Sequence, residues 1–309
     1  MEDKPPLLVV AGPTASGKTA LAVALCGALD GEVVSADSMQ VYRGMDIATA
    51  KPSPEEMRAA PHHLIGFADP GARFSVAQYA PLAHAAIRDI HARGKLPVLC
   101  GGAGLYIQAV TEGLALTPGE FHSALGGEIP ADWEALADID PDAAAKIHPH
   151  DSKRVKHALE LYHATGVTLT EQNERSRPAE RPYHARMIFL HARERQHLYD
   201  RIDARMEQML AAGLLEEAAR WRREAGDTAA QAIGYKELEP YFQGQCSLEE
   251  AAARLKQETR RYAKRQLSWF RRMAREWNQR EPGSCTELYL EDDDLPEKAL
   301  LFCEKMVVY

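Results

Sequence analysis

Residues 12–19 of this 309-residue chain read Gly12-Pro13-Thr14-Ala15-Ser16-Gly17-Lys18-Thr19. They follow an apolar run at 7–11 and precede a segment with helical character at 19–29. The pattern G-x-x-x-x-G-K-[ST] between a strand and a helix is typical of a phosphate-binding loop, whose backbone N–H groups surround an anion at the helix N-terminus. Lys18 adds a positive charge, and the Thr19 hydroxyl suits Mg²⁺. The stretch predicts a phosphate site and leaves open which phosphate it holds.

The composition is that of an ordinary globular protein, with 45% hydrophobic and 27% charged residues. The N-terminus has no basic segment followed by a long apolar one, so we expect no secretory signal. No apolar run is long enough to cross a membrane. The five cysteines are far apart and form no C-x-x-C pair, which argues against a disulfide framework or a zinc module. We therefore expect a cytoplasmic protein without membrane contact.

Charge is unevenly distributed along the chain. The net charge of −8 argues against nonspecific nucleic-acid binding, but residues 254–280 are strongly basic and include Tyr262, Trp269, Phe270 and Trp277. Two interpretations stay open for this segment. The aromatic and basic side chains contact RNA, or the segment is a long amphipathic helix whose aromatic side chains face the core.

Strands and helices alternate in the first half of the chain. A β-branched run at 32–35 ends at Asp37, a helical pattern covers 75–93, and a buried-type strand at 96–100 ends in glycines. Ligands of parallel α/β sheets lie beyond the carboxyl ends of the strands, so Asp37 should lie near the phosphate loop. There it is either a general base or a water-mediated Mg²⁺ ligand, or it only caps the following segment.

The second half is predicted to be mostly helical. Residues 114–140 are weakly periodic, with one helix candidate around Trp133, and we expect them to form a small insertion. The other expected elements are helices at 141–166, 196–224 and 248–280, a strand at 186–190 and a loop at 170–184. The prediction is an α/β fold: a P-loop NTPase-like parallel-sheet core of residues 1–113 and 141–309 with a basic helical C-terminal part, and an insertion at 114–140.

Two functions fit these patterns. One is a P-loop small-molecule kinase, and the other is an enzyme that holds a pyrophosphate leaving group in the loop while it acts on RNA. The basic segment at 254–280 favours RNA, because a kinase of small metabolites has little need for it. A nucleotide-switched binding module is less favoured, because no guanine-reading motif is present.

Taken together, several segments resemble the tRNA dimethylallyltransferase family, also called tRNA isopentenyltransferases. The similarity covers residues 7–280, and the blocks around Asp37 and at 261–270 are specific in combination. The segments that carry it are 12–19, 35–47, 49–52, 61–64, 101–106, 147–149, 158–160, 231–238 and 261–270.

The resemblance implies a reaction. A dimethylallyl group passes from dimethylallyl pyrophosphate to N6 of the adenosine directly 3′ of the anticodon, in tRNAs that read codons starting with U, and pyrophosphate is released. It implies that residues 12–19 bind the pyrophosphate, with Mg²⁺ at Thr19. It also implies two catalytic residues: Asp37 as general base and Arg205 as a clamp on the pyrophosphate.

The resemblance further implies contacts with the anticodon stem-loop of tRNA. They involve the short insertion at 114–140, Ala103 where the family has threonine, and Gln40 as a reader of the base edge. The complete set of implied tRNA-binding residues is Asp37, Ser38, Met39, Gln40, Ala103, Lys153, Arg154, Val155, Lys156 and His157. The expected partners are tRNA and dimethylallyl pyrophosphate, and the expected state is a monomer.

Overall fold

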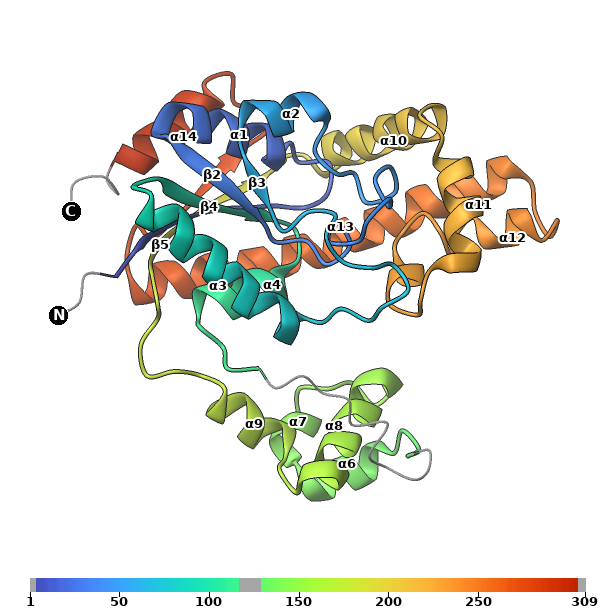
Figure 1. Cartoon of the computed structure of the whole chain (residues 1–309). Coiled ribbons are helices and arrows are strands. Elements are labelled where there is room, and N and C mark those ends of the chain that lie inside the picture. Colours follow the sequence, from blue (N-terminus) through green and yellow to red (C-terminus); the bar gives the residue numbers. More distant parts are fainter. Residues whose placement is uncertain (1–3, 117–128, 305–309) are drawn as a thin grey trace. The chain divides into compact units, whose positions relative to one another are not determined.

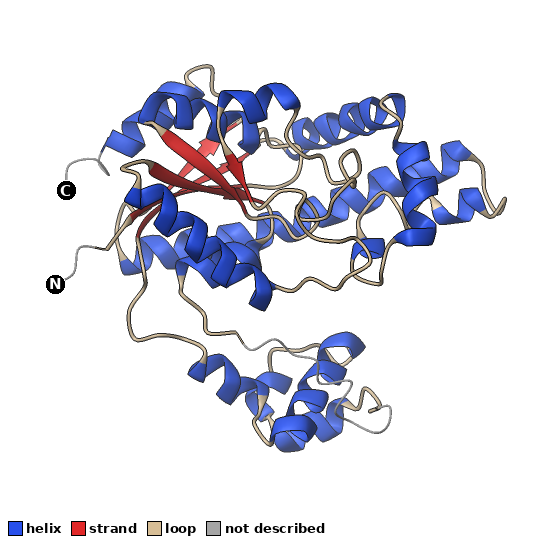
Figure 2. Ribbon diagram, viewed as in Figure 1, coloured by secondary structure: helices blue, strands red, loops and turns tan. Residues whose placement is uncertain are grey.

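The computed structural model describes residues 4–116 and 129–304, which fall into two compact units. The first unit consists of Met1–Thr111 and Pro182–Tyr309, and the second of Glu112–Arg181. The first contains the sheet and the second is helical (Figure 2). In the described ranges, no helix is both long and apolar enough to cross a membrane.

The first unit is built on a six-stranded sheet in which every strand pairing is parallel. The strand order is β3-β2-β4-β1-β5-β6. The strands are β1 (Pro6–Ala11), β2 (Gly31–Ser35), β3 (His62–His63), β4 (Leu96–Gly101), β5 (His184–His191) and β6 (Cys285–Tyr289). This confirms the predicted α/β fold, and it places β1, which leads into the phosphate loop, between two neighbours.

Both faces of the sheet are covered, as β1 illustrates. Leu7 and Val9 pack on one face and Leu8 and Val10 on the other, and all four are fully buried. Successive side chains of a strand point to opposite faces, so an unbroken apolar run suits a strand with helices on both sides. The covering helices are α3 (Val76–Ala92), α4 (Gly104–Thr111) and α13 (Leu248–Arg280) on the first face, and α1 (Lys18–Leu29) and α14 (Leu295–Glu304) on the second (Figure 1).

A helical region packs against the chain that follows β2. Residues 36–53, called the β2–α2 segment, precede α2 (Pro54–Ala59) and share a core with α11 and the first half of α13. The helices of this region are α10 (Arg195–Ala211), α11 (Leu214–Glu224) and α12 (Glu239–Phe242), with the short turn η1 (Ala229–Gln231). The single helix expected at 196–224 is two helices, because Gly213 has a φ of 99° and interrupts it.

The second unit has its own small core, and it corrects the predicted insertion at 114–140. Its helices are α6 (Trp133–Ile139), α7 (Pro141–Ala144), α8 (Ser152–Thr165) and α9 (Leu169–Arg175). Leu136 packs with Val155 and Leu159 of α8, so residues assigned to the main core belong with the insertion. Residues 117–128 of the predicted insertion lie outside the described residues.

Two further predictions in this part were wrong. The helix expected at 141–166 is split into α7 and α8, and the loop expected at 170–184 begins with α9, which starts in a capping box at Thr168. Polar composition suggested a loop there, but a capped helix needs only a narrow apolar contact, and Leu169 packs on the core of this unit.

Candidate active site

The phosphate loop joins β1 to α1, and both of its glycines are structurally required. A Cβ on Gly12 would lie 2.3 Å from the carbonyl oxygen of Leu190, which is too close for any side chain. Gly17 is the N-cap of α1 and has a φ of 78°, a conformation that L-residues disfavour. The glycines of the motif therefore bring the loop against β5 and turn it into α1.

The loop exposes hydrogen-bond donors instead of consuming them. Within the described residues, no hydrogen bond engages the backbone N–H groups of Ala15, Gly17 or Lys18. The Ser16 hydroxyl is buried and has no hydrogen-bond partner among the residues that the structure describes. Donors of this kind at a helix N-terminus suit an anion. Burial lowers the pKa of Lys18, whose Nζ lies 3.4 Å from the carbonyl oxygen of Pro13.

Two distant helices hold the loop in place. The Gln266 side chain of α13 accepts from the Thr14 N–H at 2.9 Å and donates to the Gly102 carbonyl at 2.9 Å. From α10, Arg201 Nε donates to the Ala15 carbonyl at 2.8 Å. Sequence patterns did not identify Gln266, although a polar residue on the buried side of an amphipathic helix is a usable signal.

Arg205 lies one turn after Arg201 and lines the same cavity. Burial is the main cause that lowers the pKa of Arg205, and the nearby carboxylates of Glu56 and Asp37 oppose the shift. A guanidinium group that is partly withdrawn from water and faces the phosphate loop suits a pyrophosphate.

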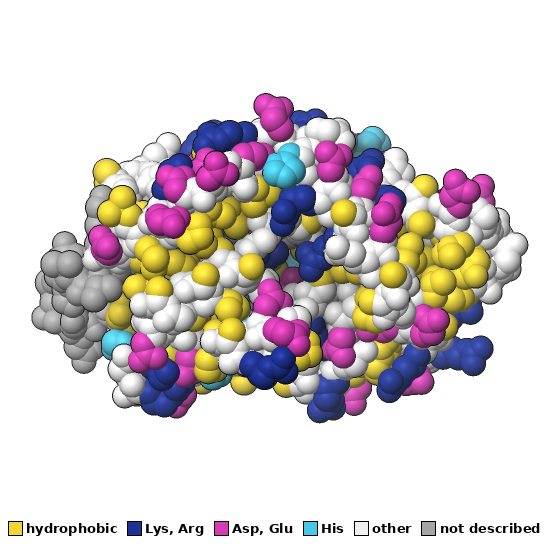
Figure 3. All heavy atoms as spheres, turned by 90° about the horizontal axis from the view of Figure 1, so that it is seen from above, with side chains coloured by type: hydrophobic (Ala, Val, Ile, Leu, Met, Phe, Trp, Pro, Cys, Tyr) yellow, Lys and Arg dark blue, Asp and Glu magenta, His cyan; other side chains and the backbone are white. Residues whose placement is uncertain are grey.

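A cavity of about 650 Å³ brings most of the predicted site residues together. Figure 3, which views the molecule from above relative to Figure 1, shows basic side chains beside a hollow near the middle of the surface. The predicted residues that line the cavity are Thr14, Ala15, Gly17, Lys18, Thr19, Asp37, Ser38, Met39, Gln40 and Arg205. Gly12, Pro13 and Ser16 are buried in the loop and support it from behind.

The structure shows Asp37 in the capping role, one of the roles that its sequence position left open. Its Oδ1 accepts from the Met39 N–H at 2.8 Å and from the Gln40 N–H at 3.3 Å, so it caps the turn after β2. No hydrogen bond reaches Oδ2 from any residue that the structure describes. Because the side chain also lines the cavity, the cap fixes the carboxylate while one oxygen is available.

Gln40 is engaged inside the protein. Its Nε2 donates to the carbonyl oxygens of Thr49 and Ala50, at 3.3 and 3.0 Å, and its Oε1 accepts from the Ser35 hydroxyl at 3.1 Å. The predicted contact of Gln40 with a base edge stays a prediction, and it would use a side chain whose orientation is already set.

Two predicted tRNA-binding positions, Ala103 and Val155, lie where the prediction did not expect them. Ala103 packs on the core at the start of α4 and does not line the cavity that the described residues form. Val155 is fully buried in the core of the second unit, so its side chain cannot contact RNA in this structure. The prediction of five consecutive contact residues missed this, because successive residues of a helix point in different directions and one side of an amphipathic helix faces the core. Lys153, Arg154 and His157 are exposed on α8, and Lys156 is half-buried.

Burial supports the amphipathic-helix interpretation of the basic helix for two of its aromatic residues, and RNA contact stays a prediction. Phe270 and Trp277 are buried in the main core, as the amphipathic-helix interpretation requires. Tyr262 instead lines the cavity, together with Arg265. Other basic side chains are exposed along α13, at Arg261, Lys264, Arg271, Arg272 and Arg275. The helix thus anchors the core with one face and presents positive charge with the other.

The chain matches two family models. The model described as IPP transferase matches residues 40–273, and the one described as Isopentenyl transferase matches residues 5–64.

Two curated relatives show the similarity along most of the chain. The chain is 48% identical over 281 residues to the tRNA dimethylallyltransferase of Roseiflexus sp. (strain RS-1), which covers 87% of this chain and 90% of that protein. It is 46% identical over 282 residues to the protein of the same name from Geobacter sulfurreducens, with 87% and 90% covered.

Solved structures agree. The full-length tRNA isopentenylpyrophosphate transferase of Bacillus halodurans has a TM-score of 0.70 and 41% identity, with 98% of each chain covered. A eukaryotic dimethylallyltransferase acting on tRNA has a TM-score of 0.79 and 29% identity, with 96% of this chain and 78% of that chain covered.

Proposed function

Since the chain belongs to the IPP transferase family, we propose that it transfers a dimethylallyl group from dimethylallyl pyrophosphate to tRNA. The acceptor is N6 of the adenosine directly 3′ of the anticodon, in tRNAs that read codons starting with U, and pyrophosphate is released. One observation carries the proposal: the phosphate loop and the carboxylate of Asp37 line the same cavity. A leaving-group site beside a base is what this transfer requires.

The residues of the phosphate loop hold the donor. The N–H groups of Ala15, Gly17 and Lys18 bind the pyrophosphate, and Lys18 with Arg205 compensates the charge that develops on it as the C–O bond breaks. Burial of Lys18 and Arg205 strengthens these interactions, because water screens them less.

Mg²⁺ fits this site only together with the substrate. The described residues contain no group of three or more His, Cys, Asp or Glu side chains that could hold a metal ion. The Thr19 hydroxyl lines the cavity, and this oxygen donor would hold Mg²⁺ together with the phosphate oxygens of the substrate. When bound, the ion neutralises charge on the leaving pyrophosphate.

Asp37 serves the acceptor. The N6 amine attacks the allylic carbon, the bond from that carbon to the pyrophosphate oxygen breaks, and the amine proton passes to the Asp37 carboxylate. The two hydrogen bonds that Oδ1 accepts keep the carboxylate oriented for this transfer. The adenine base has to leave its stack to reach the cavity.

Basic side chains outside the cavity bind the rest of the tRNA. Lys264 and Arg271 on α13 and Lys153, Arg154 and His157 on α8 are exposed and suit phosphate contacts. The proposal includes a monomeric enzyme in the cytoplasm.

Purified protein with Mg²⁺ and dimethylallyl pyrophosphate is expected to raise the mass of a tRNA that reads U-starting codons by one dimethylallyl group. A tRNA with another base at the same position is expected to stay unchanged. An unmodified tRNA combined with phosphorylation of a small metabolite from ATP would instead support the small-molecule kinase.

The variant Asp37→Asn tests the role of the base. We expect transfer to fall by about a thousandfold, in the range of lost general-base catalysis, with tRNA affinity changed less than about threefold. Asp227→Asn is the control, because Asp227 is exposed and pairs with Arg73 away from the cavity. Lys264→Ala should instead weaken binding and reduce its salt dependence. Equal loss of tRNA affinity in the Asp37 and Lys264 variants would contradict these roles.

A further inference from the structure

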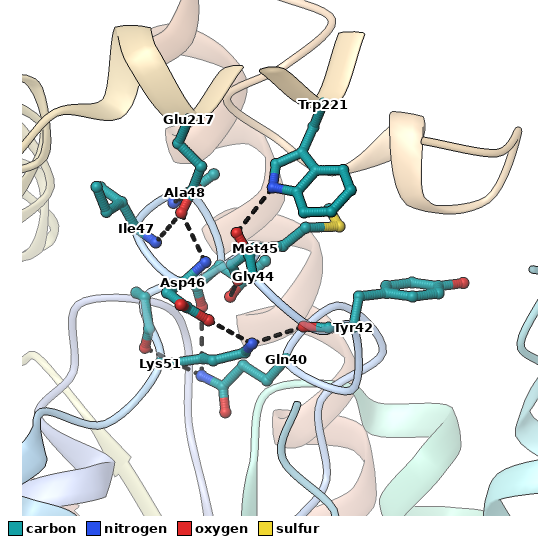
Figure 4. A network of polar contacts seen from close by, with 12 residues as sticks. Gln40, Tyr42, Gly44, Met45, Asp46, Ile47, Ala48, Lys51, Glu217 and Trp221 are labelled. Carbon is teal, nitrogen blue, oxygen red and sulfur yellow. Dashed lines mark hydrogen bonds and ion pairs between the residues drawn. The ribbon is translucent and has the colours of Figure 1, made fainter. Parts of the chain in front are cut away.

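Glu217 of α11 lies at the centre of a polar network in the β2–α2 segment (Figure 4). Its Oε2 accepts from the N–H groups of Asp46 and Ile47, at 2.7 and 2.8 Å, and its Oε1 accepts from the N–H of Ala48 at 2.8 Å. Three successive N–H groups turned toward one carboxylate form an anion-binding nest. Here the anion is a side chain of the protein, from a residue about 170 positions later in the sequence.

The same carboxylate joins a second segment. The hydroxyl of Tyr235 donates to Glu217 Oε1 at 2.9 Å, and Tyr235 is buried. Tyr235 lies between Ile233 and Lys236, which both line the cavity. Glu217 therefore fixes two walls of the cavity to each other, although it does not line the cavity itself.

A series of hydrogen bonds connects the nest to Asp37. The turn that begins in the nest continues to Thr49 and Ala50, whose carbonyl oxygens accept from the Gln40 amide. The backbone N–H of Gln40 in turn donates to Asp37. Thr49, Ala50, Gln40 and Asp37 all line the cavity.

The turn also holds a strained residue. Ala50 has a φ of 51°, in the left-handed region that a residue with a Cβ disfavours. Its N–H donates to the Ile47 carbonyl at 2.9 Å, so its conformation depends on the position of the nest. Without the carboxylate, three N–H groups lose their partner, and the turn is left with weaker support such as the bond from Lys51 Nζ to the Tyr42 carbonyl at 2.6 Å.

We propose that Glu217 is a positioning residue for the acceptor adenosine, and that it acts by holding the Thr49–Ala50 turn, and with it Gln40 and Asp37, in the geometry that receives the base. The inference rests on the proposed function. The phosphate loop is held separately by Gln266 and Arg201, so loss of Glu217 affects the acceptor and leaves the donor in place.

The test compares Glu217→Ala, Glu217→Gln and the control Glu216→Ala in the full-length protein. Glu216 is the preceding carboxylate on α11, is exposed, and is not part of the nest. Steady-state rates with saturating donor and varied tRNA give kcat/KM for the acceptor. Rates with saturating tRNA give the KM for dimethylallyl pyrophosphate.

We expect kcat/KM for tRNA to fall by about 10- to 100-fold in Glu217→Ala, because hydrogen bonds to a charged acceptor are lost. The KM for dimethylallyl pyrophosphate should stay within about twofold of the wild type, because no donor contact changes. Glu217→Gln keeps the shape of the side chain and one carbonyl oxygen. Its kcat/KM for tRNA should therefore lie between the values of Glu217→Ala and the wild type. Glu216→Ala should behave like the wild type.

Amide hydrogen exchange supplies a readout that does not depend on activity. The amides of residues 46–48 should exchange faster in Glu217→Ala, while those of residues 12–19 keep their wild-type rates. Faster exchange at 46–48 with unchanged kinetics for tRNA overturns the inference, because the network is then only structural. An equal loss of kcat/KM for tRNA and for dimethylallyl pyrophosphate also overturns it. So does a Glu217→Gln variant that folds and has the kcat/KM for tRNA of the wild type.

The wild-type arm separates the two proposals. Wild-type protein that does not prenylate tRNA overturns the proposed function, and the inference with it. Active wild-type protein with an unaffected Glu217→Ala variant overturns the inference alone.

Discussion

The phosphate loop at 12–19 and the turn at 46–50 both turn backbone N–H groups toward one point, but only in the turn do these groups have a partner among the described residues. Both follow strands of one sheet, and in both several backbone N–H groups make no hydrogen bond to another backbone group of the described residues. In the phosphate loop, the N–H groups of Ala15, Gly17 and Lys18 have no partner among the described residues. In the turn, the N–H groups are filled by the carboxylate of Glu217.

The difference shows how a similar backbone feature becomes a binding site in one place and a support in the other. A loop that binds a ligand must keep its donors available, so it is held from outside, by Gln266 and Arg201. A loop that only shapes a wall gains stability when the protein satisfies its donors. Which of the two a nest becomes depends on what the rest of the chain places against it.

The largest effect is expected at the phosphate loop. Lys18→Ala removes a buried positive charge from the donor site, and we expect kcat for transfer to fall by about a thousandfold, as when an electrostatic stabiliser of the leaving group is lost. Stopped-time assays of labelled tRNA measure this. Lys256→Ala, which breaks an ion pair with Glu207 away from the cavity, is the control and should stay close to the wild type. Comparable losses in both variants would contradict a specific role of Lys18.

An intermediate effect is expected where the loop is held. Gln266→Leu removes the hydrogen bonds to the Thr14 N–H and the Gly102 carbonyl, and the KM for dimethylallyl pyrophosphate should rise by about 10-fold. The KM for tRNA should change much less. Ser268→Ala, an exposed position on the same helix, is the control. A selective rise in the KM for tRNA would show that Gln266 affects binding of the acceptor. It would contradict the assignment of the phosphate loop to the donor and of the turn at 46–50 to the acceptor.

The last effect is expected on stability and not on catalysis, near the Glu217 network. Gly44 has a φ of 69°, and a Cβ there would lie 2.9 Å from the ring of Trp221, whose Nε1 donates to the Gly44 carbonyl at 2.7 Å. Gly94 has a similar φ of 74° but open space around it. Both Gly→Ala variants cost about 1 kcal/mol in backbone strain.

Gly44→Ala should cost about 1–3 kcal/mol more from overpacking. Thermal melts should show a Tm for Gly44→Ala several degrees below that of Gly94→Ala, since about 1 kcal/mol shifts Tm by roughly 2–4 °C in a chain of this size. Equal melting temperatures would mean that the Trp221 ring yields easily and that the turn is softer than the phosphate loop.

Local patterns predicted a large part of the fold. The bounds of α13 match the predicted helix at 248–280, because an apolar stripe recurs along 33 residues and a capping box opens the helix. The strands β1, β2, β4 and β5 were predicted from apolar and β-branched runs. A separate insertion was predicted but its C-terminal bound was not, because Leu136 and Val155 belong to one core only when α6 and α8 pack together. The final strand β6 and helix α14 were also missed, since the acidic residues 291–294 masked two short apolar elements.

The sequence by itself determined the phosphate loop of this protein, because consecutive residues form it and its glycines and lysine lie within one turn. It also determined that Asp37 lies nearby, because the carboxyl ends of parallel strands share an edge. Only the tertiary structure decided how these parts are held. Gln266 meets Thr14 from 252 residues away, and Glu217 meets Ala48 from 169. Each bond joins one side-chain group to a backbone group, and no local spacing encodes which backbone a folded helix will face.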